Sequence, residues 1–417
     1  MAILLHVEVV QRRQSRASKE YIKDLVHTFL ANFVSLTPGA SLTDDDFYEN
    51  QELMEHVQCI TFCDVENDSS AVVLTECEIK YHIYTLDTFG AETDTMMDSA
   101  SGEEIAAAEV CALPAEQFHG LWESLVYDSK LKEDTLRFVE TAFEFSDRNV
   151  DSNIISWNRV VLLHGPPGTG KTSLCRALAQ KLAIRLSHKF PRARLLEINA
   201  HGLFSKWFSE SGKLVAKLFD RIREIVEDKR LFACILVDEI ESLAHTRRAA
   251  IAGLEPSDSI RAVNAILTQL DRLKHHPNAL VLTTSNVTGA IDVAFVDRAD
   301  IKRLVGPPSD RAAYKILHGC CCELMNRGVV VPKETLLTLH VLEASRFADS
   351  EGSRASLQLR EVAMEAAAAN MSGRALRRLP FLAKALHAPA QVNLIQFIDA
   401  LNLALKQYLS DIQDLND

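Results

Sequence analysis

One short segment has the residue types and the spacing of a site that binds the phosphates of a nucleotide. It fits the pattern G-x-x-x-x-G-K-S/T and consists of Gly165, Pro166, Pro167, Gly168, Thr169, Gly170, Lys171 and Thr172, with Ser173 next. Glycines let backbone N–H groups surround phosphate oxygens without a Cβ in the way. We expect Lys171 to reach the β- and γ-phosphates and the Thr172 hydroxyl to bind Mg²⁺. This segment is therefore a predicted binding site for ATP.

Two carboxylates follow further along the chain, where a hydrolytic site needs them. Asp238 and Glu239 come directly after the apolar run that begins at Leu231. A buried strand that ends in two acids places them at the carboxyl edge of a sheet, beside the phosphates. We expect Asp238 to hold Mg²⁺, mostly through water, and Glu239 to orient and deprotonate the attacking water. An ordinary acid pair at a strand end is disfavoured because both the spacing and the strand context agree with the catalytic interpretation.

A third polar group ends the next apolar run. Asn286 follows Thr283, Thr284 and Ser285, and a short amide there is able to hydrogen-bond the attacking water or the γ-phosphate. Read alone, the segment is an ordinary turn. Together with the two preceding motifs it predicts a polar sensor in an enzyme that hydrolyses ATP with Mg²⁺.

The elements that must position these residues follow an α/β pattern. From about Pro114, apolar strands alternate with helices, which is typical of a parallel sheet. The predicted strands are Arg159–His164, Leu231–Val237 and Ala279–Thr284, and the predicted helix after the phosphate loop is Ser173–Ala183. After Pro307 and Pro308 the pattern becomes helical, with amphipathic helices over Leu376–Leu386 and Leu394–Leu409. This part predicts a separate helical lid.

The first 90 residues mix the two kinds of pattern. His6–Val9 and Glu78–Tyr84 alternate as half-buried strands do, and Tyr21–Val34 has helical spacing. Thr88–Glu104 is small, acidic and Gly/Ser-bearing, as linkers are. We therefore predict a small α+β domain over 1–90, a linker over 91–113, a large ATPase subdomain over 114–305 and a lid subdomain over 306–417.

Composition and charge limit the classes of protein and partner. The chain has 417 residues, of which 47% are apolar and 24% charged, and no apolar run has the roughly 20 residues of a membrane span. Nine cysteines lack the spacing of a disulfide framework, which predicts the nucleus and cytoplasm as compartments. The net charge is −12, and Lys80 is the sole Lys or Arg between Lys23 and Lys130. Direct binding of nucleic acid by the region between Lys23 and Lys130 is therefore disfavoured. This region is either a solvated acidic face or a surface for a basic partner.

Further segments resemble the AAA+ ATPase family. Arg261–Asp271 looks like that family's helix after the acidic strand end, and Ile291–Asp300 resembles its second region of homology. In the family this region supplies arginine fingers to the ATP of a neighbouring subunit, which implies a homo-oligomeric ring, usually a hexamer. Asp297 stands where many members carry one of two arginines, so Arg298 is the candidate finger and Arg303 the alternative. The competing interpretation of Arg298 is an ion pair with Asp297 or Asp300.

Two other segments resemble functional loops of the same family. Ser372-Gly373-Arg374 is similar to the sensor-2 motif, in which an arginine of the lid touches the γ-phosphate, and we choose Arg374 over Arg377 and Arg378. Ser205–Lys213 looks like pore loop 1, where an aromatic pair grips a threaded polypeptide. The matching residues are Trp207 and Phe208. The alternative for these two rings is burial in the core.

The chain most resembles the pachytene checkpoint ATPase family, whose members remodel HORMA-domain proteins. The segments that carry this resemblance are Phe118–Asp128, Glu255–Asp258, Val296–Lys302, Ser372–Arg374 and Leu379–Leu382. It implies HORMA-domain clients, an adaptor protein, and control of the meiotic chromosome axis and the spindle checkpoint. It also implies that Leu121–Tyr127 borders the adenine. The alternatives are a nucleic-acid motor or clamp-loader-like ATPase, and a nucleotide-gated scaffold, against which Glu239 argues.

Overall fold

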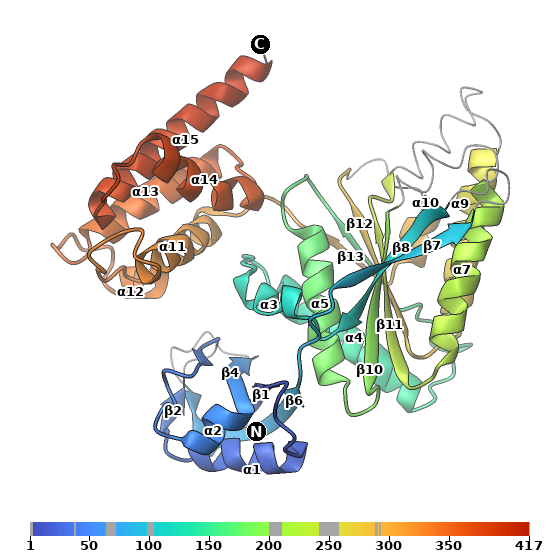
Figure 1. Ribbon diagram of the computed structural model, residues 1–417. Coiled ribbons are helices and arrows are strands. Elements are labelled where there is room, and N and C mark those ends of the chain that lie inside the picture. Colours follow the sequence, from blue (N-terminus) through green and yellow to red (C-terminus); the bar gives the residue numbers. More distant parts are fainter. Residues whose placement is uncertain are drawn as a thin grey trace.

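The computed structural model describes residues 3–36, 39–63, 72–97, 104–199, 211–241, 258–287, 291 and 293–416. A small N-terminal domain, a central sheet flanked by helices, and a C-terminal group of helices follow one another along the chain (Figure 1). Within these ranges, no helix combines the length and the apolar character needed to cross a membrane.

The central sheet has the strand order β13-β9-β12-β11-β10-β8-β7. The bounds are β7 Ala91–Met97, β8 Glu104–Leu113, β9 Val160–His164, β10 Arg192–Asn199, β11 Leu231–Asp238, β12 Ala279–Ser285 and β13 Ile301–Leu304. The strands from β13 to β10 are parallel, so their carboxyl ends lie at one edge of the sheet. The predicted strands β9, β11 and β12 are confirmed, and they are buried on both faces, as continuous apolar runs indicate.

Helices cover both faces of this sheet. They are α3 Leu121–Ser124, α4 Leu131–Asp147, α5 Lys171–Arg185, α7 Ser211–Glu227, α9 Asp258–Leu273 and α10 Val293–Arg298. Side chains of α4 and α5, such as Phe143 and Leu178, pack with Phe232 on one face. Side chains of α7 and α9, such as Phe219 and Leu270, pack on the other. The phosphate loop between β9 and α5 is therefore fixed between two buried elements.

The linker predicted over 91–113 is wrong. β7 and β8 pair with each other in antiparallel fashion, and β8 pairs antiparallel with β10, so both strands extend the ATPase sheet. The segment is rich in small and acidic residues. Among its side chains whose burial the structure describes, Ala108, Cys111 and Leu113 are buried. Backbone pairing to β10, a tertiary contact, decides its conformation.

The N-terminal domain contains a four-stranded sheet in the order β3-β4-β1-β6. Its elements are β1 Ile3–Gln11, α1 Lys19–Leu30, β2 Ser35–Leu36, β3 Ser41–Leu42, α2 Gln51–His56, β4 Val57–Cys63, β5 Val72–Val73 and β6 Cys77–Tyr84. The strands predicted in β1 and β6 and the helix predicted in α1 are present. The half-buried character expected of β1 is wrong, because every residue from Leu5 to Gln11 is buried. Its polar face is covered by the ATPase subdomain.

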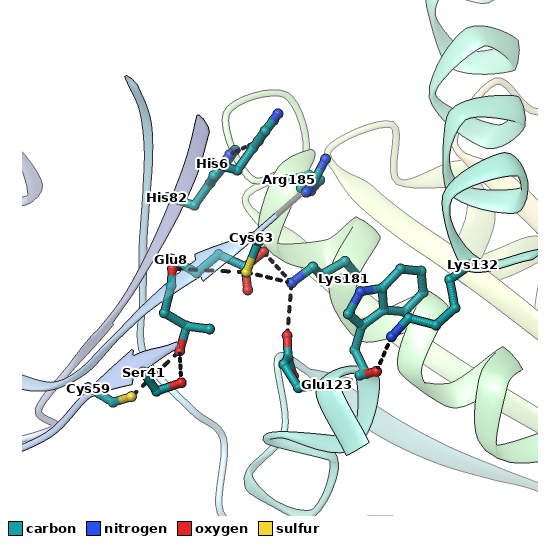
Figure 2. A network of polar contacts seen from close by, with 12 residues as sticks. His6, Glu8, Ser41, Cys59, Cys63, His82, Glu123, Lys132, Lys181 and Arg185 are labelled. Atoms are coloured by element: carbon teal, nitrogen blue, oxygen red, sulfur yellow. Dashed lines mark hydrogen bonds and ion pairs between the residues drawn. The ribbon is translucent and has the colours of Figure 1, made fainter. Parts of the chain in front are cut away.

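That contact is a buried charged network between β1, β4, α3 and α5 (Figure 2). Lys181 Nζ lies 2.8 Å from Glu8 Oε1, 3.2 Å from Glu123 Oε1 and 3.1 Å from Cys63 Sγ. The side chains of Lys181 and Glu8 are 2% and 4% exposed. Burial opposes the charged form of Lys181, yet Glu8 and Glu123 raise its pKa above the ordinary value. The network therefore joins the N-terminal domain to the helix that follows the phosphate loop.

The C-terminal part is helical, as predicted. It consists of α11 Asp310–Asn326, α12 Leu339–Ala344, α13 Arg354–Ala368, α14 Gly373–Leu386 and α15 Leu394–Asn416. These helices share a separate core that includes Leu317, Leu359, Leu376 and Phe397. The lid follows directly after β13, the edge strand next to β9 (Figure 1).

Candidate nucleotide-hydrolysis site

The phosphate loop has a backbone that requires glycine. Gly165 has φ +140°, and a Cβ built there would lie 2.3 Å from the carbonyl oxygen of Val305. Gly170, with φ +92°, is the N-cap of α5. The N–H groups of the first residues of α5 have no acceptor within the helix, so this helix start is suited to bind an anion, as a phosphate site needs.

Lys171 lies inside this loop. Its ammonium group donates to the carbonyl oxygens of Gly165 and Pro166, both at 2.8 Å. Burial lowers the pKa of Lys171, while the carboxylates of Glu241 and Asp238 oppose that shift. The ammonium group thus faces the two acids across the place where phosphate oxygens are expected. Its N–H donors, which now bind the two carbonyl oxygens, are able to bind phosphate oxygens instead.

Thr172 and Asp238 meet as the sequence predicts. The Thr172 hydroxyl donates to the Asp238 carboxylate, with Oγ1 at 3.1 Å and 3.2 Å from its two oxygens. Hydroxyl and carboxylate oxygens are the hard ligands that Mg²⁺ prefers. This oxygen pair at the carboxyl edge of the sheet fits a magnesium ion bound to nucleotide phosphates.

Glu239 and Asn286 lie at the ends of adjacent parallel strands. β11 and β12 pair in parallel up to Val237 and Thr283, so both residues follow at the same sheet edge. Glu239 has φ +59°, and its N–H donates to Thr284 Oγ1 at 3.2 Å. The Asn286 N–H donates to Glu241 Oε1 at 3.1 Å. The sequence analysis assigns no role to Thr284, although a polar residue inside a buried strand is a signal for one. It assigns none to Glu241, which follows β11.

The candidate arginine fingers are both in ion pairs within the chain. Arg298 binds Asp271 with two hydrogen bonds, from Nε at 2.9 Å and from Nη2 at 2.8 Å. The competing interpretation of Arg298 was an ion pair with Asp297 or Asp300, and the ion pair that the structure shows is with Asp271 of α9. Asp300 instead accepts from the N–H groups of Asn158 and Val160. Arg303 lies 3.8 Å from an oxygen of Asp134. Which of Arg298 and Arg303 acts in trans stays a prediction.

The lid meets the phosphate loop through the predicted sensor-2 segment. The Arg374 N–H donates to the Gly168 carbonyl at 3.0 Å, and Ser372 caps α14. The Arg374 side chain is exposed, and its charge contributes to the lowered pKa of Lys171. Arg374 is thus the arginine of this segment that lies at the phosphate site, whereas Arg377 donates to the Ser124 carbonyl. Trp207 and Phe208 fall outside the described residues.

A cavity of about 210 Å³ opens beside the phosphate loop. It is lined by Val126 and Tyr127 from the predicted adenine-binding segment, and the Tyr127 hydroxyl donates to the Gly170 carbonyl at 3.2 Å. Gly306, Pro308 and Ile316 also line it. The sequence interpretation took the Gly-Pro-Pro stretch only as a domain boundary. Its apolar surface beside the loop suits a flat base.

Comparisons with known families cover nearly the whole chain. Residues 161–307 match the ATPase family associated with various cellular activities (AAA). Residues 309–409 match the TRIP13-like, AAA+ ATPase lid C-terminal domain, and residues 2–89 match the TRIP13 N-terminal domain.

Individual relatives agree with these matches. The pachytene checkpoint protein 2 homolog of Mus musculus is 48% identical over 416 residues, which cover 99% of this chain and 95% of that protein. The Homo sapiens homolog is 47% identical over 415 residues, which cover 99% and 94%. The structure of C. elegans PCH-2 has 32% identity and a TM-score of 0.78, and covers 98% of this chain and 100% of that one.

A more distant likeness concerns the fold alone. A chain of the E. coli MS115-1 HORMA:CdnC:Trip13 complex is 18% identical with a TM-score of 0.53, over 70% of this chain and 93% of that one. The full-length relatives, by contrast, match the N-terminal domain, the nucleotide site and the lid together. With the phosphate loop, the two acids and the lid contact in place, the chain is an ATPase that belongs to the pachytene checkpoint protein 2 family of AAA+ proteins.

Proposed function

We propose that this ATPase works as a homo-oligomeric ring, a hexamer, that uses the hydrolysis of ATP to unfold part of a HORMA-domain client. The observation that carries the proposal is the likeness to pachytene checkpoint protein 2 homologs along the whole chain, N-terminal domain included. A further support is that a chain of similar fold occurs in the E. coli MS115-1 HORMA:CdnC:Trip13 complex. Control of the meiotic chromosome axis and of the spindle checkpoint is part of the same proposal.

The geometry of the site supports an in-line attack of water on the γ-phosphorus. Lys171 and the loop N–H groups hold the phosphates, and Thr172 and Asp238 would hold Mg²⁺, which neutralises phosphate charge. Glu239 takes a proton from the attacking water while Asn286 orients that water. The bond from the γ-phosphorus to the bridging oxygen breaks, and ADP leaves with that oxygen.

Lid movement is the proposed output of hydrolysis. Arg374 would contact the γ-phosphate from α14, whose first turn already rests on the Gly168 carbonyl. Loss of the γ-phosphate removes that contact and so changes the equilibrium between lid positions. Trp207 and Phe208 would carry the movement to the client, because aromatic side chains grip apolar surface without needing a particular partner residue.

The N-terminal domain is the proposed recognition part for the client or its adaptor. Its acidic balance favours a basic partner over nucleic acid. The nucleus and cytoplasm are the proposed compartments, which the free thiols of all nine cysteines support.

A trapping experiment tests this function. The Glu239→Gln variant should bind ATP, hydrolyse it at least about a hundredfold more slowly, and hold a HORMA-domain protein in an ATP-dependent pulldown. The Lys171→Ala variant serves as the control, since it should not bind ATP and should retain no client. Equal recovery of the HORMA protein with both variants, or recovery with neither, contradicts the proposal.

The alternative of a nucleic-acid motor has its own measurement. Binding to single- and double-stranded DNA is measured across a salt series. The remodelling proposal expects weak binding, whereas tight binding that falls steeply with salt supports a motor.

A further inference from the structure

The end of β12 contains three consecutive hydroxyl residues that are all buried. Thr283, Thr284 and Ser285 are each at most 1% exposed. The hydroxyls of Thr283 and Ser285 donate to backbone carbonyls, those of Val161 and Val287 respectively. These two hydroxyls therefore bind only backbone carbonyl oxygens with their hydrogens. Thr284 differs, because its hydroxyl contacts the two acids at the end of β11.

Thr284 binds three successive residues at the end of β11. Its hydroxyl donates to Asp238 Oδ1 and accepts from the Glu239 N–H, with 3.2 Å between the nitrogen and Oγ1. Its carbonyl oxygen accepts from the Ile240 N–H at 3.0 Å. A hydroxyl has one donor hydrogen and two acceptor positions, so both side-chain contacts are made at once.

These contacts act where the backbone is strained. Glu239 has φ +59°, in the left-handed region that residues with a side chain rarely adopt. Such conformations persist when the surrounding structure holds them. The Glu239 and Ile240 N–H groups lie on either side of this turn, and Thr284 binds both. The direction of the Glu239 side chain therefore depends on Thr284.

The same hydroxyl also fixes the other acid. By donating to Oδ1, Thr284 sets the plane of the Asp238 carboxylate, whose oxygens lie 3.1 Å and 3.2 Å from Thr172 Oγ1. We propose that Thr284 is a positioning residue for ATP hydrolysis: its hydroxyl aligns Asp238 toward the Thr172 oxygen and holds Glu239 in its left-handed turn. It acts through these two acids, without touching the nucleotide itself.

Replacement by valine isolates the hydroxyl. Valine keeps the branched shape and suits a buried strand, but it removes the hydroxyl that accepts from the Glu239 N–H and that donates, beside Thr172, to Asp238 Oδ1. Serine keeps the hydroxyl. Thr283→Val is the matched control, because Thr283 is equally buried on the same strand and its hydroxyl donates only to a carbonyl of β9.

The test compares Thr284→Val, Thr284→Ser and Thr283→Val in the full chain. For Thr284→Val we expect kcat to fall by about tenfold or more with KM for ATP changed by less than about twofold, as loss of a hydrogen bond to a charged group predicts. The Mg²⁺ concentration that half-saturates binding of a fluorescent ATP analogue should rise several-fold. Thr284→Ser and Thr283→Val should keep kcat and the Mg²⁺ dependence near the wild-type values.

Two outcomes overturn the proposal. A Thr284→Val variant with wild-type kcat and Mg²⁺ dependence would show that the hydroxyl does not position the acids. Equal loss in Thr284→Val and Thr283→Val would show that buried hydroxyls at this strand end only support the fold. The inference rests on ATPase activity alone, so its failure leaves the proposed HORMA client untouched, and the failure of that proposal leaves this one standing.

Discussion

Single residues of the phosphate loop show how closely backbone and chemistry are linked. A Cβ at Gly165 would approach the Val305 carbonyl to 2.3 Å, at a φ of +140° that side chains avoid. We therefore expect Gly165→Ala to lower the free energy of unfolding by at least about 2 kcal/mol. Gly319→Ala in α11 is the control, because a Cβ there meets nothing within 4 Å and the helix gains up to about 1 kcal/mol. Urea denaturation of both variants measures the difference, and equal midpoints would contradict this account.

A second residue-scale feature is the histidine pair of the N-terminal domain. His6 Nδ1 and His82 Nε2 lie 2.9 Å apart in one hydrogen bond, and both residues are buried (Figure 2). Burial, with Arg185 and Lys80 among the nearby cations, lowers the pKa of His6 to about 2. Burial, with Lys80, Lys181 and His188, lowers the pKa of His82 to about 4. Both rings are therefore neutral in the folded protein at neutral pH.

This pair makes stability depend on pH in a defined direction. Unfolding returns both histidines to their ordinary pKa of 6.5, so the unfolded chain binds more protons below that pH. The free energy of unfolding is therefore highest above pH 6.5. Below that pH it should fall by about 1.4 kcal/mol per pH unit for each histidine as the pH drops toward 4. Denaturation midpoints from pH 7 to pH 5 measure this slope. The double variant His6→Gln/His82→Gln should flatten it, and an unchanged slope would assign the effect to other groups.

At the scale of elements, α5 connects the nucleotide site to the N-terminal domain. Its first residue is Lys171 of the phosphate loop, and Lys181 near its other end holds Glu8 and Glu123. Glu123 belongs to α3, directly before the residues that line the cavity at the phosphate loop. Helix α5 and the short segment that begins with α3 therefore each connect the nucleotide site to the buried network.

Removing the central cation should release the N-terminal domain. Lys181→Met leaves the buried carboxylate of Glu8 without its ammonium partner and removes the ion pair of the more exposed Glu123. Loss of the partner of a buried charge should cost about 3–5 kcal/mol. We expect faster hydrogen exchange in β1 and a lower denaturation midpoint. Lys23→Met, at an exposed position of α1, is the control and should change stability by less than about 0.5 kcal/mol. If the amide hydrogens of β1 exchange in Lys181→Met at the wild-type rate, the role of the network is contradicted.

The elements also show what the sequence predicts and what it does not. β9, β11 and β12 were predictable because each is a continuous apolar run, and because polar residues at their ends mark the sheet edge. Asp238 and Thr172 meet there as expected. β7 and β8 were not predictable, because their segment is rich in small and acidic residues and its strands form through pairing of β7 with β8 and of β8 with β10. The alternation of β1 indicated a strand, but the burial of Glu8 depends on Lys181, 173 residues further along the chain (181 − 8).

At the scale of the whole molecule, the proposed ring would complete each nucleotide site with an arginine of a neighbouring copy. Arg298 ends α10 and is held by Asp271 of α9 in a two-point ion pair. This ion pair fixes the plane of the guanidinium group. If it acts in trans, each active site consists of the phosphate loop of one subunit and the Arg298 of the next.

Mixing defective subunits distinguishes action in trans from action in cis. Lys171→Ala and Arg298→Ala rings should each lose at least about a hundredfold in kcat. In rings assembled from equal amounts of both, about a quarter of the junctions join an intact phosphate loop to an intact Arg298, so activity should return in proportion. Lys171→Ala mixed with Glu239→Gln is the control, because both defects lie on the same side of the junction and each active site needs both residues from one subunit. Activity that stays absent from the first mixture, although its rings assemble, would exclude Arg298 as the trans residue, and the same experiment with Arg303→Ala would then test the other arginine.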